Sequence, residues 1–195
     1  MDVLALHARS VDLWLDRVRS VAADQLGAAT PCSEWDVRAL LNHVVGEDRW
    51  TAPLVEGGTI EEVGDRFDGD LLGASPRDAA EQAGKEAVAA FAEPGAGERT
   101  VHLSFGDTPA EEYAWQLTAD HVVHAWDLAV ATGGDTNLDD ELVRAVADWF
   151  VDREELYRGG GAIAPRPDSS VTSDQDRLLV GFGRDPGWRA SGPPG

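Results

Sequence analysis

Apolar residues recur along this chain at the spacing of amphipathic helices. In the first segment, about residues 2–27, the spacing between successive apolar residues alternates between four and three positions. This spacing is typical of the buried face of a helix in a bundle. A second helix is expected from Glu34 to about Ala52, with Ser33 as its N-cap and Pro53 at its end. The chain therefore opens with two helices that each have a buried face.

The rest of the chain is mostly helical in pattern. A connection over 57–75 is rich in Gly and Asp and long enough to cross the end of a bundle. Helices are expected at about 76–92, 109–132 and 139–157, and a short one within 173–183. Residues 99–105 alternate between apolar and polar side chains, which predicts a short extended piece or edge strand. The helix at 109–132 is apolar almost all round and is therefore expected at the centre.

The predicted elements indicate an all-α fold in two parts. Residues 1–158 are expected to form a helical bundle, with the segment at 139–157 as an extra helix. Residues 159–195 are expected to form an irregular C-terminal extension that packs on the bundle. The last residues, 191–195, are Ser-Gly-Pro-Pro-Gly and should be disordered.

The composition limits the binding partners that the protein can have and the cellular compartment in which we expect it. The 195 residues include 36 acidic and 16 basic ones, for a formal net charge of −20. Such an excess argues against nucleic acid or an anionic membrane as a partner. Cys32 is the only cysteine, so no internal disulfide can form. No segment has the length of a membrane span or the apolar core of a signal peptide, and we therefore expect a cytoplasmic protein.

The helix at 109–132 carries an acid and a histidine four residues apart, Asp120 and His124. A four-residue step advances about 6 Å and turns about 40° past a full turn, so both side chains project from one face. His121 and Asp127 lie at the two edges of the same arc. Polar groups inside an apolar stripe need partners, because burying them unpaired is costly.

The second helix repeats this arrangement with His43 and Glu47. If the two helices face each other, His43, Asp120 and His124 can supply two imidazoles and one carboxylate. Glu47 would then be a fourth ligand or would orient one. Such a set with open positions suits catalytic Zn²⁺, and also Fe²⁺, Ni²⁺ or Mn²⁺. The alternative is a buried hydrogen bond between Asp120 and His43 without a metal.

The remaining candidate residues give weaker signals. His102 lies on the polar side of its extended piece, and His7 lies near the edge of the first apolar seam. Cys32 lies at a helix N-terminus, where the helix dipole favours a thiolate. In a continuous helix, however, Cys32 would lie about 16 Å from His43 along the axis, too far to share a metal. Thiol chemistry at this site would then need an external thiol.

Three stretches of the chain resemble a known family. Thr30-Pro31-Cys32, Trp35, Leu40 and His43 resemble the signature of the DinB-like metal-binding superfamily, and more closely its actinobacterial branch near mycothiol-dependent maleylpyruvate isomerase. The stretch DHVVHAWDLAVATG, residues 120–133, resembles that branch's second signature. The stretch DRLLVGFGRDPGW, residues 176–188, is similar to the C-terminal close of its uncharacterised members.

This resemblance implies a DinB-like four-helix bundle of up-down-down-up type. It also implies a divalent metal, zinc first, held by His43, Asp120 and His124. The branch usually has Glu at the position of Asp120, and His121 is the fallback ligand.

The implied function is that of a transferase or isomerase that uses mycothiol or a similar thiol on a small electrophile, with Glu47 and Asp127 orienting the ligands. The alternative is a non-catalytic metal-binding bundle, such as a stress or sensor protein. Trp115 and Trp126 add apolar surface on the back of the helix at 109–132. A homodimer is therefore compatible with the sequence, as is a monomer.

Overall fold

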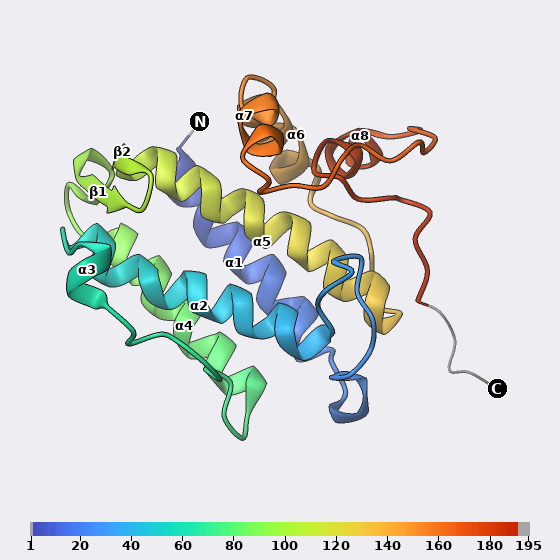
Figure 1. Ribbon diagram of the computed structural model, residues 1–195, viewed down its shortest axis with the longest axis horizontal. Coiled ribbons are helices and arrows are strands. Elements are labelled where there is room, and N and C mark those ends of the chain that lie inside the picture. Colours follow the sequence, from blue (N-terminus) through green and yellow to red (C-terminus); the bar gives the residue numbers. More distant parts are fainter. Residues whose placement is uncertain (1, 191–195) are drawn as a thin grey trace.

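Four long helices form the body of the molecule, which the computed structural model describes over residues 2–190 (Figure 1). They are α1 (Val3–Arg19), α2 (Val37–Val55), α4 (Pro76–Ala92) and α5 (Ala110–Thr132). In Figure 1, α1 and α5 run in one direction, and α2 and α4 run in the opposite one. The expected bundle of up-down-down-up type is therefore confirmed, with the long link joining two parallel helices.

Shorter elements fill the connections and the C-terminal part. They are α3 (Ile60–Val63), α6 (Asp140–Phe150), α7 (Glu154–Gly159), α8 (Asp174–Gly181) and the 3₁₀ turns Ala23–Gln25 and Ala96–Glu98. The single helix predicted at 139–157 is thus two helices, because the chain turns where the N–H of Arg153 bonds the carbonyl of Phe150 at 2.9 Å. The residues expected to be disordered, 191–195, lie outside the described residues.

The start of α2 differs from its sequence signals. Asp36, not Ser33, is the N-cap, and one of its carboxylate oxygens accepts from the N–H of Ala39 at 2.8 Å. Residues 28–36 fold back before the helix, with an antiparallel bridge between Ala29 and Asp36. The chain before α2 is therefore a compact loop rather than a further turn of helix.

The end of α2 also differs, because Pro53 lies inside the last turn and the helix continues to Val55. A proline there removes one N–H donor. Its own carbonyl still accepts from the N–H of Gly58 at 2.9 Å, which keeps the turn closed.

A small hairpin interrupts the helices. Strands β1 (Thr100–Leu103) and β2 (Gly106–Pro109) pair antiparallel, with Val101 opposite Thr108. The first strand matches the predicted extended piece, but the second has Gly, Asp and Pro, which are depleted in strands. Gly106 forms the turn with a φ of 128°, a conformation that favours glycine. The fold is mostly helical with this one hairpin rather than strictly all-α.

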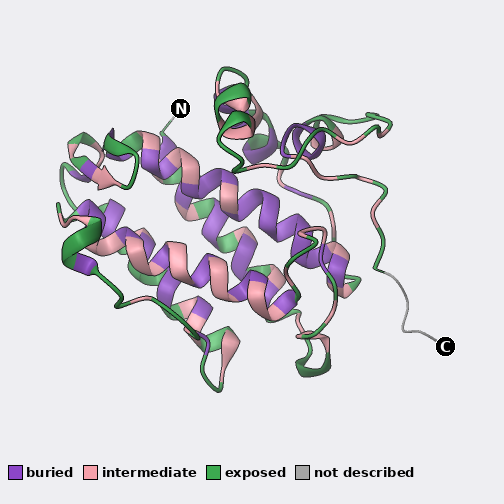
Figure 2. Ribbon diagram, viewed as in Figure 1, coloured by how far each residue is buried: buried purple, intermediate pink, exposed green. Residues whose placement is uncertain are grey.

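The core surrounds α5, which is buried along most of its length (Figure 2). Leu128 of α5 packs in one cluster with Trp14 of α1 and Leu179 of α8. Phe182, just after α8, stacks on Phe150 of α6 with ring centroids 3.9 Å apart. The C-terminal segment therefore packs into the same core as the bundle helices.

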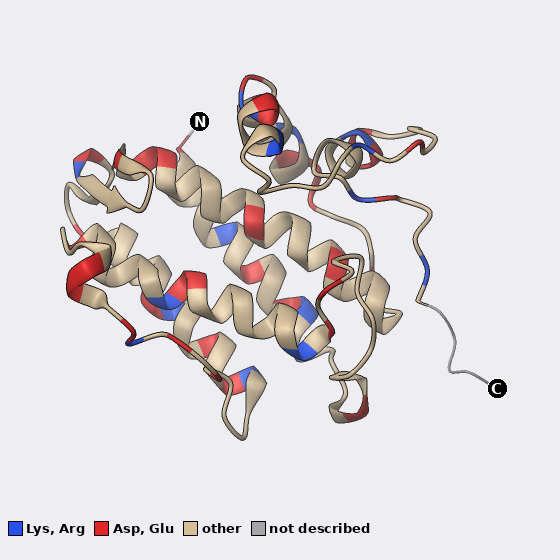
Figure 3. Ribbon diagram, in the orientation of Figure 1, with Lys and Arg blue, Asp and Glu red and all other residues tan. Residues whose placement is uncertain are grey.

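Charged side chains lie mainly outside this core. Figure 3 shows acidic residues spread over α3, α7 and the connecting loops, where water solvates them. Within the part of the chain that the structure describes, no helix is long and apolar enough to cross a membrane.

Candidate metal centre

Two histidines from different helices converge on Asp120, where α2 and α5 face each other. Nε2 of His43 lies 3.3 Å from Oδ2 of Asp120, and Nε2 of His124 lies 3.2 Å from Oδ1. The first contact joins the two helices, and the second follows from the four-residue step along α5. The three residues that the sequence singled out are therefore together in space.

The spacing of these atoms fits a metal ion. With Zn–N and Zn–O distances near 2.0–2.1 Å, two ligands of a tetrahedral zinc lie about 3.3 Å apart. The imidazoles lie 3.3 and 3.2 Å from different oxygens of Asp120, and one ligand atom from each of His43, Asp120 and His124 lies within 4.8 Å of the other two. Oδ2 of Asp120 is buried without a well-formed hydrogen bond. Two imidazoles and a carboxylate with one orphaned oxygen are thus a suitable donor set for a divalent metal.

Electrostatics tie the same groups together. Burial alone would raise the pKa of Asp120, but the neighbouring imidazoles of His124 and His43 hold it well below its usual range. Burial alone would lower the pKa of His124, but the Asp120 carboxylate, with help from Asp127, raises it well above its usual range. Without a metal, a proton on His124 therefore balances the charge of Asp120.

The other ring nitrogen of His124 has its own partner. Nδ1 lies 2.9 Å from Oδ2 of Asp127, whose side chain is fully buried. Burial alone would raise the pKa of Asp127, but His124 and Arg184 hold it below its usual range. An ionised Asp127 accepts the Nδ1 proton, so Nε2 is the nitrogen that faces Asp120.

Glu47 has a looser relation to the site. Its Oε1 lies 4.0 Å from Nδ1 of His43, beyond hydrogen-bond reach, and 44% of its side chain is exposed. The ring of Trp35 packs at 4.6 Å from that of His43 and 5.9 Å from that of His124. An aromatic ring therefore holds the two imidazoles from the side of the loop before α2.

Cys32 lies much closer to the site than its position in the sequence predicted. Its Sγ lies 3.4 Å from Oδ2 of Asp127 and accepts from Nη2 of Arg184 at 3.0 Å. The expected separation assumed a continuous helix, whereas residues 28–36 fold back over α5. The hydroxyl of Thr30 closes this loop by donating to the carbonyl of Trp35 at 2.8 Å.

Arg184 is a residue of the site that the sequence did not reveal. Its Nη2 donates to Oδ2 of Asp127 at 2.9 Å, although the two residues are far apart in the chain. Arg184 follows Gly183, whose φ of 75° turns the chain after α8. This contact depends on how the C-terminal segment packs against the bundle, and no spacing or periodicity in the sequence predicts it.

His121, the fallback ligand, faces away from Asp120. Its Nε2 lies 3.0 Å from Oδ1 of Asp48, and it belongs to a separate group with His7. Neighbouring residues on a helix point about 100° apart, which explains the different surroundings of Asp120 and His121. His102 pairs with Asp107 at 2.7 Å on the hairpin and is partly exposed.

A cavity of about 490 Å³ opens onto the three converging residues. Trp35 and Cys32 line it, and the C-terminal segment lines it through residues 161–164 and 182–184. This volume lies within the range of about 300–1,000 Å³ that small-molecule sites occupy. The site thus has protein on one side and space for a small molecule on the other.

Comparison with known sequences adds a family context. Residues 7–129 match the family described as mycothiol maleylpyruvate isomerase N-terminal domain. Over 146 residues the chain is 40% identical to the uncharacterized protein Rv0738 of Mycobacterium tuberculosis and to its counterpart in a second strain. That alignment covers 73% of this chain and 74% of each relative.

The fold is similar to that of solved structures of the mycothiol-dependent maleylpyruvate isomerase. The TM-score is 0.59 for a mutant of that enzyme and 0.55 for a second structure of it, at 17% identity. The alignments cover 74% of this chain and 66% of that chain, which is just under two thirds of the isomerase. At this identity the likeness shows the fold alone.

Proposed function

Because the chain belongs to the mycothiol maleylpyruvate isomerase N-terminal domain family, we propose that it binds a divalent metal through His43, Asp120 and His124. We further propose that it activates a low-molecular-weight thiol there for reaction with a small electrophile. Zinc suits the donor set best, and nickel, iron and manganese share it. Mycothiol or a similar thiol is the proposed co-substrate, and the reaction class is transfer or isomerisation.

The convergence of His43 and His124 on Asp120 carries this proposal. The cavity beside them supports a reaction over a purely structural metal, because the three residues leave one side of the site open. A non-catalytic sensor or stress protein with a structural metal would call for a fourth protein ligand. Glu47 is the candidate for it that the sequence offers, but among the described residues it does not join the group of ligand atoms of His43, Asp120 and His124 that lie within 4.8 Å of one another.

A divalent metal at this site would lower the pKa of a bound thiol and so supply a thiolate at neutral pH. The chain's own residues prepare the site for this chemistry. Asp127 holds the proton of His124 at Nδ1, and Arg184 balances the charge of Asp127. Trp35 shields one side of both imidazoles from water.

The sulfur of the reaction is proposed to come from outside the chain. Cys32 lies beside Asp127 and Arg184, on the Nδ1 side of His124, rather than between the Nε2 atoms. Its position suits a residue that supports the orientation of Asp127. The cavity next to the Nε2 atoms is left for the external thiol.

The test uses cobalt in place of the native metal, because Co²⁺ reports its ligands by visible absorption. The Co²⁺-loaded protein is titrated with mycothiol and then with small electrophiles, and adducts are followed by mass spectrometry. We expect a sulfur-to-cobalt absorption band and thiol adducts that His43→Ala does not give. Unchanged cobalt absorption on addition of thiol would contradict the proposed thiol chemistry.

A further inference from the structure

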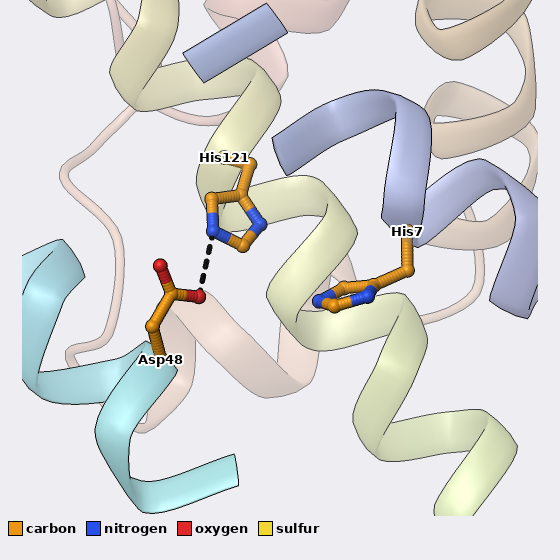
Figure 4. Close-up of side chains that lie close together, drawn as sticks. All are labelled: His7, Asp48 and His121. Carbon is orange, nitrogen blue, oxygen red and sulfur yellow. Dashed lines mark hydrogen bonds and ion pairs between the residues drawn. The ribbon is translucent and has the colours of Figure 1, made fainter. Parts of the chain in front are cut away.

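A second group of potential ligands lies inside the bundle, apart from the cavity. His7 of α1, Asp48 of α2 and His121 of α5 point toward one another from three helices (Figure 4). Their exposed fractions are 0%, 0% and 1%. One donor atom from each residue lies within 4.8 Å of the others. Two imidazoles and a carboxylate therefore meet where water has no access.

Several polar atoms of this group have no hydrogen-bond partner. Both ring nitrogens of His7 and Oδ2 of Asp48 are buried, and no residue within 2–190 gives them a hydrogen-bond partner. Leaving a buried polar group unsatisfied costs about 1–3 kcal/mol. Burial, and then the nearby His121, lower the pKa of His7 well below its usual range, so its ring is neutral and has a free lone pair. The interior thus holds unused donor atoms of the kinds that bind metals.

His121 is oriented as a ligand would be. Ser10 donates its hydroxyl proton to the carbonyl of His7 at 2.8 Å, and its Oγ lies 3.5 Å from Nδ1 of His121. Without a metal, Nε2 of His121 donates its proton to the Asp48 carboxylate. When a metal displaces that proton, Ser10 can accept the remaining proton at Nδ1, and Nε2 is the nitrogen free to bind the metal. Nε2 lies 3.0 Å from Oδ1 of Asp48. This distance is close to the separation of about 3.3 Å between two ligand atoms of a tetrahedral zinc.

The walls of the group are apolar and tightly packed. The ring of Phe91 lies 4.9 Å from that of His7. Gly84 of α4 packs so close that a Cβ there would lie 3.7 Å from Oδ2 of Asp48 and 2.8 Å from Val11. An apolar wall strengthens the attraction between a carboxylate and a cation.

From this geometry we propose that His7, Asp48 and His121 bind a second divalent transition-metal ion, separate from the proposed catalytic one. The ion joins α1, α2 and α5, gives one ring nitrogen of His7 and the Asp48 carboxylate a partner, and acts as a structural metal. Because the group is sealed, the ion enters as the chain folds and exchanges slowly afterwards. The site lies away from the cavity, so it takes no part in thiol chemistry.

The experiment counts metal ions in protein refolded with Zn²⁺ and then dialysed against a weak chelator. Wild type is expected to keep two ions per chain, and Asp48→Asn and His43→Ala one each. The double variant should keep none. The two proposals fail separately: a wild-type count in Asp48→Asn overturns the internal site, and a wild-type count in His43→Ala overturns the proposed function.

His7→Leu keeps the test decisive if Asp48→Asn does not fold. This change removes two unpartnered nitrogens, so the metal-free protein should be as stable as wild type or more stable. If the internal metal exists, His7→Leu should bind one ion fewer per chain than wild type. The increase in Tm on metal binding should also be smaller in the variant. If His7→Leu keeps the wild-type metal count, the internal site is overturned.

Discussion

Nδ1 of His124 lies 2.9 Å from Oδ2 of the fully buried Asp127. This contact fixes the tautomer of His124 and turns its Nε2 toward Asp120, so a residue outside the proposed ligand set decides how a ligand is presented. Arg184 and Cys32 converge on the same carboxylate. The C-terminal segment is therefore coupled to the proposed metal centre.

Replacing Asp127 by Asn should weaken metal binding without emptying the site. The amide lacks the charge that holds the Nδ1 proton, and losses of about 10–100-fold are typical for such partners. The measurement is a competition titration with a chromophoric chelator. Asp68→Asn, an exposed change in the long link, is the matched control and should bind as wild type does. Equal affinities for Asp127→Asn and wild type would refute the positioning role.

Asp120 should tolerate a longer carboxylate but not the loss of one. Asp120→Asn leaves two imidazoles and no charge, and we expect a loss on the order of 100-fold or more in metal affinity. Asp120→Glu should recover most of that loss, because a glutamate can reach the same space from α5. Calorimetric titration with Zn²⁺ measures both variants. If Asp120→Asn binds as tightly as Asp120→Glu, the carboxylate is not a ligand.

The pKa of His124 predicts how acidity affects the metal-free protein. Its pKa is raised in the fold, so the stability it contributes is complete below about pH 6.5, the ordinary pKa of histidine, and is lost as pH rises through the raised value. The pKa of Asp120 is lowered, so its contribution is present above its ordinary value and is lost in acid. The unfolding free energy lost in His124→Gln should therefore shrink as pH rises from 6 toward 10. If the unfolding free energy lost in His124→Gln grew with pH, the raised pKa of His124 would be contradicted.

Metal binding should show the opposite trend with pH. A metal must displace the proton on His124, so affinity rises with pH by about tenfold per unit below the raised pKa. Calorimetry near pH 7 in buffers of different ionisation enthalpy should reveal release of a proton. Binding at neutral pH without proton release would show that His124 is already neutral.

Gly84 allows α1 and α4 to approach closely. A Cβ at Gly84 would lie 2.8 Å from Val11, whereas a Cβ at Gly46 of α2 would lie 3.6 Å from the end of Leu71, an ordinary contact. Gly84→Ala should destabilise by about 1–3 kcal/mol through overpacking. Gly46→Ala should be neutral or stabilise by up to about 1 kcal/mol through helix propensity. Urea unfolding of metal-free protein compares them, and the reverse order would contradict the packing.

Arg184 should hold the C-terminal segment on the bundle. Arg184→Leu leaves the buried Asp127 without its guanidinium partner, a change that costs about 3–5 kcal/mol in buried pairs. Limited proteolysis should then cut the segment after residue 159 faster. Arg189→Leu is the control, because Arg189 is exposed and, among the residues that the structure describes, its side chain donates to the backbone carbonyls of Pro186 and Trp188. Equal cleavage rates for both variants would show that Arg184 does not anchor the segment.

The parts of the fold that follow local rules could be predicted from the sequence. The bounds of α4 follow from Pro76 and the break after Ala92, and the central place of α5 follows from its apolar faces. The second strand of the hairpin was hidden by its Gly and Pro. The start of α2 was misplaced because Ser33 and Asp36 both suit an N-cap, and only the fold-back of residues 28–36 decides between them.

The same distinction applies to the site. The four-residue step of Asp120 and His124 predicts a shared face, and the apolar arc around His43 predicts that it turns inward. The positions of Cys32 and Arg184 beside the site depend on how a loop and the C-terminal segment pack against the bundle. No local sequence pattern predicts this packing. Asp48 was missed because its partners, His7 and His121, come from two other helices.

The metal content of wild type and His43→Ala, measured side by side after reconstitution and dialysis, tests the central claim most directly. His43 is the ligand that α2 gives to this centre, and its removal leaves the pair on α5 intact. The proposed centre predicts that wild type keeps one more ion per chain than His43→Ala, whatever the internal group binds. Equal metal content in the two folded proteins would show that His43, Asp120 and His124 form a buried ion-pair network without a metal.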